Sequence, residues 1–266
     1  MVSAVREFTE ELPGGLKGYE QALRRFAGDI YAAASADGSR YFLDKTPRYS
    51  LIAEEIHNVF PDAKFIYLWR NPLAIIASSI ETWGRPGQWN IHRIFVDLFV
   101  GLPALVSAVE RHGDGAYTCR FEDLAAGVEA WRGMFHYLEL DWDEASFQSF
   151  QEVEFNGAMG DQVGRRRYSH LATEPIEKWM TVINNPLRKW WSKRYLRWLG
   201  PKRLEIMGYE QTELFAAIDA APSSGKRILA DALAMIYGWF YASFELPMLR
   251  RKWIAWRQNK KYVAHR

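Results

Sequence analysis

The sequence predicts an α/β protein in which a mostly parallel sheet is flanked by helices. Three short apolar segments, Tyr41–Leu43, Lys64–Trp69 and Ala116–Arg120, are each followed by a helical pattern. Continuous rather than alternating hydrophobicity is typical of strands that are buried on both faces. Strands and helices that alternate at this spacing indicate an open α/β sheet with helices on its faces. We therefore expect the three segments to share one sheet.

The first elements follow from local patterns. Between residues 19 and 34, apolar side chains recur at the spacing of one helical face, and Ala36–Ser39 breaks the pattern. The Tyr41–Leu43 strand then delivers a polar segment, 44–47, at its carboxyl end. A second helix is expected from about Ser50 to Val59.

The middle of the chain repeats this order of strand and helix. Lys64–Trp69 is the clearest strand, and Pro72 suits the first turn of the next helix because its missing N–H is not needed there. That helix should extend to about Trp83. A long helix is expected over about 91–112, and another over 121–137 after the third strand.

The last hundred residues differ in composition from the rest. No strand candidate follows Gly157, and residues 164–203 contain eleven Lys or Arg against two Glu. A linker rich in small residues and proline at 220–225 interrupts the helical pattern. We therefore expect an α/β domain over 1–220 and a helical, basic and aromatic appendage over 221–266.

The appendage admits two interpretations. Ala232–Phe244 is uncharged, but as a helix it would be about 20 Å long, short of the ~30 Å hydrocarbon layer of a bilayer. Pro247 should bend or end the helix, and lysines, arginines and tryptophans follow it. This order suits an anchor at the surface of an anionic membrane. The same helix would equally suit packing against the α/β domain or a second copy.

Charge and cysteine content exclude several classes. The 266-residue chain has 34 Lys plus Arg against 32 Asp plus Glu, a net charge of +2, so we expect no nucleic-acid partner. Cys119 is the single cysteine, which excludes an internal disulfide and a cysteine-rich zinc site. The opening residues lack the apolar core of a signal peptide. These features indicate a cytoplasmic protein, with peripheral membrane contact only through the appendage.

Polar side chains follow two of the predicted strands. Lys45 follows the first and Arg70 the second, and ligands of open α/β sheets bind at the carboxyl ends of the strands. Arg70 can hold a phosphate bidentately, and Ser78, eight residues later, could reach the same anion. The helix N-terminus at 71–72 would add positive charge. The alternative is that Arg70 caps its own loop and Ser78 packs on a face of small residues.

Three motifs carry a family resemblance. DKTPRY at 44–49, FPDAKFIYLWRNPLAIIASS at 60–79 and YTCRFEDL at 117–124 resemble, in this order, elements of the PAPS-dependent sulfotransferases, chiefly their bacterial and carbohydrate branch. The similarity covers about 40–210 and ends in GYE at 208–210. It implies a P-loop NTPase-like fold and 3′-phosphoadenosine 5′-phosphosulfate (PAPS) as co-substrate, without a metal. The acceptor would be the hydroxyl or amine of a small-molecule, carbohydrate or lipid-linked compound.

The resemblance also implies roles for individual residues. Arg70 and Ser78 would bind the 3′-phosphate of PAPS. Lys45 would be catalytic, neutralising the charge that develops on the leaving phosphate as the S–O bond breaks. A basic loop that contains Arg165, Arg166 and Arg167 would close over the nucleotide, although the same residues could form a solvated basic surface.

The sequence departs from the family pattern in two places. The loop that binds the 5′-phosphosulfate should precede 44–49, but the glycine-rich Pro13–Gly18 follows no strand, so we expect an N-terminally incomplete version of the fold. Ser223–Arg227 lacks the first glycine of a P-loop and has arginine in place of its Ser or Thr. Phe121 occupies the position of the usual tyrosine. An inactive, sulfotransferase-like nucleotide-binding or scaffolding protein is therefore the alternative to an enzyme.

The general base is left open by the sequence. A carboxylate or a histidine must reach the proton of the acceptor. The candidates by position are Glu10, Glu11, Glu20, Asp44, Glu54 and His57.

Overall fold

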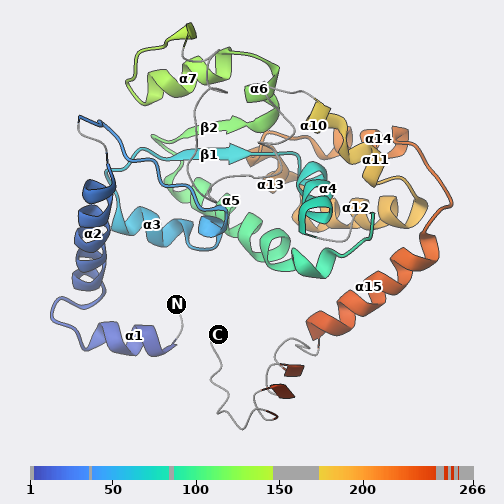
Figure 1. The fold of residues 1–266 in the computed structure, drawn as a ribbon, viewed down its shortest axis with the longest axis horizontal. Helices are drawn as coiled ribbons and strands as arrows, with labels where there is room; N and C mark the ends of the chain where they lie inside the picture. Colours follow the sequence, from blue (N-terminus) through green and yellow to red (C-terminus); the bar gives the residue numbers. More distant parts are fainter. Residues whose placement is uncertain are drawn as a thin grey trace.

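The computed structural model describes residues 3–35, 38–83, 87–145, 174–243, 249–250, 253–254 and 257. Within these ranges the protein is mostly helical and has a small parallel sheet (Figure 1). Its strands are β1 (Ile66–Trp69) and β2 (Tyr117–Arg120), which pair in register from Ile66 opposite Tyr117 to Trp69 opposite Arg120. The predicted α/β class and two of the three predicted strands are thereby confirmed.

The prediction of a strand at Tyr41–Leu43 is wrong. The described sheet has two strands, and residues 41–46 form an extended segment without strand pairing. Side chains hold this segment in place: the Tyr41 hydroxyl donates to the carbonyl of Leu138 at 2.9 Å, and the Phe42 ring stacks on Tyr31 with centroids 4.5 Å apart. The Leu43 side chain is 82% exposed, so its hydrophobicity does not report burial in a sheet.

The strand β1 is also less enclosed than its sequence indicates. Tyr67 and Trp69 are buried, whereas Leu68 between them is 51% exposed. Successive side chains of a strand point to opposite faces, so one face of β1 lies in the core and the other is largely open. The expectation of burial on both faces is wrong at this position.

The helices before β1 are α1 (Ser3–Glu10), α2 (Gly15–Ala34), the 3₁₀ turn η1 (Pro47–Leu51) and α3 (Ala53–Val59). The connection from β1 to β2 consists of α4 (Pro72–Trp83), the 3₁₀ turn η2 (Ile91–Arg93), the π-helical turn η3 (Asp97–Gly101) and α5 (Leu102–His112). The helix that we expected over 91–112 is thus divided. Pro103 explains the start of α5, because it cannot donate to a carbonyl in the preceding turn.

The helices after β2 are α6 (Phe121–Ala126), α7 (Glu129–Tyr137), α10 (Glu174–Glu177), α11 (Trp179–Val182), α12 (Pro186–Leu199), α13 (Pro201–Ile206), α14 (Gln211–Ala220) and α15 (Ile228–Ser243). The helix expected over 121–137 is interrupted at Gly127, between α6 and α7. In Figure 1, α15 lies at the periphery, beyond the helices that pack around the sheet. Among the described helices, none is both long and apolar enough to cross a membrane.

The hydrophobic core lies where α4 meets the C-terminal helices. Leu73, Ile76 and Ile80 recur at helical spacing along α4 and are almost completely buried. They belong to one cluster with Trp69 of β1 and with buried residues of the segment that runs from α11 to α14, among them Ile183, Leu196, Leu199, Leu204, Met207 and Ile218. This core fixes α4 against the end of β1, where the anion site is expected.

Candidate functional site

The sheet places Arg70 at its carboxyl edge, directly before the helix that carries Ser78. Arg70 directly follows the last residue of β1, and α4, which carries Ser78, begins two residues later. Arg70 and Ser78 are both partly buried, whereas Ala74 and Ala77 on the same helix are buried. Within the described chain the Ser78 hydroxyl has no hydrogen-bond partner. A partly exposed hydroxyl without a partner is suited to bind a ligand oxygen.

Phe121 supports the Arg70 side chain. Trp69 and Arg120 are partners in the sheet, so the residues that follow them emerge side by side. The Arg70 guanidinium lies over the Phe121 ring, 4.6 Å from its centroid. Such a cation–π contact orients the planar guanidinium. In the sequence, Phe121 is only a departure from the family pattern, and no local signal indicates its contact with Arg70.

The N-terminus of α4 is already occupied by protein groups. The backbone N–H of Asn71 donates to the Glu122 carboxylate at 3.0 Å, and that of Leu73 donates to the Asn71 side chain at 2.9 Å. Pro72, between them, has no N–H. We expected this helix end to contribute positive charge to an anion site, but the Glu122 carboxylate offsets it. An anion bound here would therefore depend mainly on the side chains of Arg70 and Ser78.

The end of β2 and the residues after it contact the GYE segment at 208–210. The Tyr209 hydroxyl donates to Glu122 at 2.7 Å, and burial together with this carboxylate raises the pKa of Tyr209. Arg120 forms two hydrogen bonds to Asp123, at 2.7 and 2.8 Å, and a third to the carbonyl of Gly208 at 3.0 Å. Hydrogen bonding to Arg120 lowers the pKa of Asp123. The YTCRFEDL motif and the GYE segment are thus hydrogen-bonded to each other. The presence of both in the sequence is the signal that could have indicated this contact.

Lys45 lies in the extended segment before η1. It is exposed and has no hydrogen bond or ion pair to any residue that the structure describes. The preceding Asp44 accepts hydrogen bonds from the Tyr49 hydroxyl, at 2.8 Å, and from the Tyr31 hydroxyl of α2. Hydrogen bonding to Asp44 raises the pKa of both tyrosines, so they remain protonated donors. These contacts fix the backbone beside Lys45.

Three of the candidate general bases have structural partners. The Asp44 carboxylate accepts the two phenol hydrogen bonds described above, and Glu54 forms an ion pair with Arg111 at 2.6 Å. His57 is hydrogen-bonded to the Tyr67 hydroxyl and stacks on Phe65 with centroids 3.6 Å apart. These contacts assign Glu54 and His57 to the packing of α3, not to an acceptor site.

Two further segments bear on the binding of the nucleotide: the basic loop at 165–167 and the glycine-rich segment at 13–18. Arg165, Arg166 and Arg167 lie outside the described residues, so their role stays a prediction. The glycine-rich segment at 13–18 comprises the end of the turn after α1 and the first turn of α2, and Gly14 and Gly15 have positive φ values of 84° and 59°. It connects two helices, unlike a phosphate-binding loop that follows a strand.

Comparison with known proteins identifies the family. Residues 10–144 match the model described as the Sulfotransferase family, a range that contains Lys45, Arg70 and Ser78. A 64-residue part of the chain is 45% identical to Nodulation protein NoeE of Sinorhizobium fredii, which amounts to 24% of this chain and 15% of that relative. No solved structure matches the chain. Because the family match spans half of the sequence and includes the residues at the end of β1, the chain belongs to the sulfotransferase family.

Proposed function

We propose that the protein transfers a sulfuryl group from PAPS to a hydroxyl or amine acceptor. One observation carries this proposal: within the range that matches the family, Arg70 leaves the end of β1 on top of the Phe121 ring, and the helix that follows carries the unpartnered Ser78 hydroxyl. A guanidinium and a hydroxyl on successive elements suit a phosphate group. Ligands of parallel sheets bind at this edge.

The 3′-phosphate of the donor would occupy this site. Arg70 would donate two N–H groups to the phosphate oxygens, and Ser78 would donate its hydroxyl. Phe121 would hold the guanidinium plane, since the stacked ring restricts the orientations of Arg70. Binding the 3′-phosphate serves to position the sulfuryl group at the other end of the nucleotide, which converts binding free energy into orientation.

The transfer would replace one bond to the sulfur atom with another. The acceptor oxygen or nitrogen attacks the sulfur atom while the bond from sulfur to the bridging phosphate oxygen breaks, and adenosine 3′,5′-bisphosphate leaves. The acceptor loses its proton to a base. The Lys45 ammonium would stabilise the negative charge on the departing oxygen, a contribution that is largest in the transition state. Its position next to Asp44, which Tyr31 and Tyr49 hold, supports such a role.

The alternative is a protein that binds the nucleotide without turning it over. One observation favours it: the residues at the end of β1 would suffice to bind the nucleotide, whereas Lys45 is exposed and makes no contact with a described residue that would aim it at the sulfuryl group. Such a protein would bind adenosine 3′,5′-bisphosphate through Arg70 and Ser78 but would transfer no sulfate.

A transfer assay with labelled PAPS and a panel of hydroxyl and amine acceptors tests the proposal. Sulfated product should form with the wild type, and Lys45→Ala should lower turnover by about 10²-fold or more with little change in bisphosphate affinity. Arg48→Ala is the matched control, because Arg48 lies three residues away in an exposed ion pair with Asp97 at 3.3 Å. Bisphosphate binding without any product would favour the alternative. Equal turnover in wild type and Lys45→Ala would remove Lys45 from the mechanism.

A further inference from the structure

The helix α15 presents an apolar stripe to solvent. Leu229, Leu233, Ile236 and Phe240 are between 44 and 75% exposed. They follow one another at steps of four, three and four residues, so they form a continuous row along the helix. Tyr237 and Trp239, both more than half exposed, flank this row. We refer to Leu229, Leu233, Ile236 and Phe240 as the α15 stripe.

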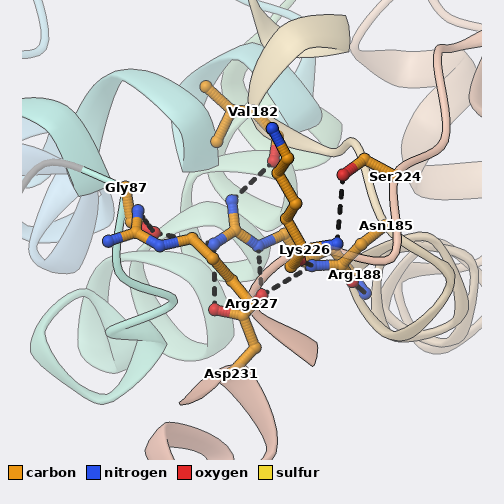
Figure 2. A network of polar contacts seen from close by, with 8 residues as sticks. All are labelled: Gly87, Val182, Asn185, Arg188, Ser224, Lys226, Arg227 and Asp231. Carbon is orange, nitrogen blue, oxygen red and sulfur yellow. Dashed lines mark hydrogen bonds and ion pairs between the residues drawn. The ribbon is translucent and has the colours of Figure 1, made fainter. Parts of the chain in front are cut away.

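A buried ion pair fixes the opposite face of α15 to the protein. Asp231 and Arg188 of α12 are 2% and 3% exposed, and they form two hydrogen bonds of 2.6 and 2.9 Å (Figure 2). Asn185 donates to the same carboxylate at 2.7 Å. The remaining guanidinium hydrogen bonds reach the carbonyls of Val182 and Gly87, at 2.8 and 2.7 Å.

Further along, α15 contacts η2. The His92 ring lies 5.2 Å from that of Tyr237 and 4.9 Å from that of Tyr241, and Met235 packs against the core. Because the ion pair and these ring contacts are made by residues outside the stripe, the helix cannot turn the stripe inward without breaking them. The stripe is therefore a fixed external surface.

The sequence from Pro247 onward carries charge of one sign. Asp231 is the one ionisable acid or base of α15 apart from its tyrosines, and Arg188 neutralises it. From Pro247 to the end, the sequence contains no Asp or Glu and seven cations: Arg250, Arg251, Lys252, Arg257, Lys260, Lys261 and Arg266. Trp253 is half exposed, with the Arg257 guanidinium over its ring at 4.3 Å.

We propose that the α15 stripe, together with the exposed Leu249, Arg250, Trp253 and Arg257 that follow it, binds the surface of an anionic lipid bilayer. An exposed apolar row accompanied by tryptophans and lysines or arginines is what an interfacial helix requires: apolar area for the acyl boundary and cations for the headgroups. The helix lies on the surface and does not span, since its sixteen residues reach about 24 Å against the ~30 Å hydrocarbon layer. The proposal is independent of the catalytic one.

A second copy of the chain fits this surface less well. In a twofold contact the same patch of both copies meets, so Arg250 and Arg257 of one copy would face the same cations of the other. Like charges in such an interface oppose association. Anionic lipid headgroups supply the opposite charge, and we therefore commit to the bilayer as the occupant.

Flotation with lipid vesicles tests the proposal. The full chain should float with vesicles of phosphatidylcholine and phosphatidylserine and much less with phosphatidylcholine alone, and 0.5 M salt should release it, because salt screens the attraction between cations and lipids. The double variant Leu233→Gln/Phe240→Gln should lose roughly tenfold or more in partitioning. Both side chains are exposed, so the fold is retained, and circular dichroism of the variant verifies this.

Phe26→Gln is the matched control. Phe26 is 66% exposed on α2, comparable with the stripe residues, but no run of cations follows α2. This variant should float like the wild type. Equal flotation of the wild type and the double variant would overturn the proposal, as would equal binding to neutral and anionic vesicles. Light scattering gives the oligomeric state of each protein. If the wild type and Phe26→Gln are dimers and the double variant is a monomer, the stripe binds a second copy, and the proposal is overturned. A truncation before α15 is less suitable, because it would leave Arg188 buried without its carboxylate.

Discussion

The guanidinium of Arg70 lies over the ring of Phe121, 4.6 Å from its centroid. The two residues are fifty-one positions apart, and they meet because Trp69 and Arg120 are partners in the parallel sheet. The sheet thus supplies both the cation of the candidate phosphate site and the surface on which that cation rests.

Replacing Phe121 should weaken nucleotide binding. Phe121→Ala removes the stacked ring and should lower the affinity for adenosine 3′,5′-bisphosphate by about two- to tenfold, because a partly exposed cation–π contact contributes on the order of 0.5–1 kcal/mol. Phe121→Tyr keeps the ring and serves as the control, with affinity at least equal to that of the wild type. Calorimetry on the three proteins measures the effect. Equal affinities for Phe121→Ala and the wild type would show that the ring has no part in binding.

Removing the charge of Glu122 should strengthen binding. Its carboxylate accepts the Asn71 N–H at 3.0 Å at the start of α4, where it repels an incoming phosphate. Glu122→Gln retains an acceptor oxygen and should raise bisphosphate affinity about two- to fivefold at low salt, an increase that salt should diminish. Titrations at two salt concentrations measure both quantities. Weaker binding by Glu122→Gln at unchanged stability would contradict a site near this helix end.

The buried pair of Arg188 and Asp231 should matter for stability far more than an exposed pair. Asp231→Ala leaves the buried guanidinium without its carboxylate and should cost about 3–5 kcal/mol of the free energy of unfolding. The exposed pair of Lys193 and Asp219 is the comparison, and Asp219→Ala should cost about 0–1 kcal/mol. Urea denaturation of both variants measures the difference. Similar losses in the two variants would contradict the importance of the buried pair.

The histidine pair between α3 and α5 should make stability depend on pH. Burial, and then repulsion by His112, lowers the pKa of His57 below its ordinary 6.5. The rings of His57 and His112 stack with centroids 4.6 Å apart, and the nearby ion pair of Glu54 and Arg111 joins the same two helices. Between the folded and unfolded pKa values the unfolded chain binds more protons, so stability is constant above about pH 6.5 and falls as the pH is lowered through that value.

The matched variant for this prediction is His57→Phe, which keeps a stacking ring and removes the titrating group. Its melting temperature should fall less than that of the wild type between about pH 7 and pH 5. The variant also loses the contact with the Tyr67 hydroxyl, so the slope of stability with pH is compared, not its absolute value. Parallel pH profiles of the two proteins would exclude His57 as the cause.

The sequence predicted those parts of the fold in which hydrophobic pattern and burial coincide. Lys64–Trp69 and α4 lie where the pattern placed them, because Trp69, Leu73, Ile76 and Ile80 enter one core. Tyr41–Leu43 has an equally apolar pattern but lies in an extended segment that side chains hold. A short apolar run indicates buried or contacting side chains, and it does not reveal whether a neighbouring strand is available for pairing.

The candidate site was predictable only where its residues follow from local patterns in the sequence. Arg70 and Ser78 could be read from their spacing around a predicted strand and helix, as could Lys45 from its motif. The contacts that support them depend on tertiary structure: Phe121 lies beneath Arg70, and Glu122 holds both Asn71 and Tyr209. The neutralising role of Glu122 at the start of α4 follows from the pairing of β1 with β2, which no local pattern contains.

The most direct test of the account is the affinity of Arg70→Ala for adenosine 3′,5′-bisphosphate, measured by calorimetry beside the wild type and Arg48→Ala. If Arg70 binds the 3′-phosphate, its loss should weaken binding about ten- to hundredfold, on the order of 1.5–3 kcal/mol for a charge-assisted contact. Arg48→Ala removes an exposed guanidinium from η1 and should leave the affinity unchanged. Equal affinities for Arg70→Ala and the wild type would contradict the phosphate site at the end of β1.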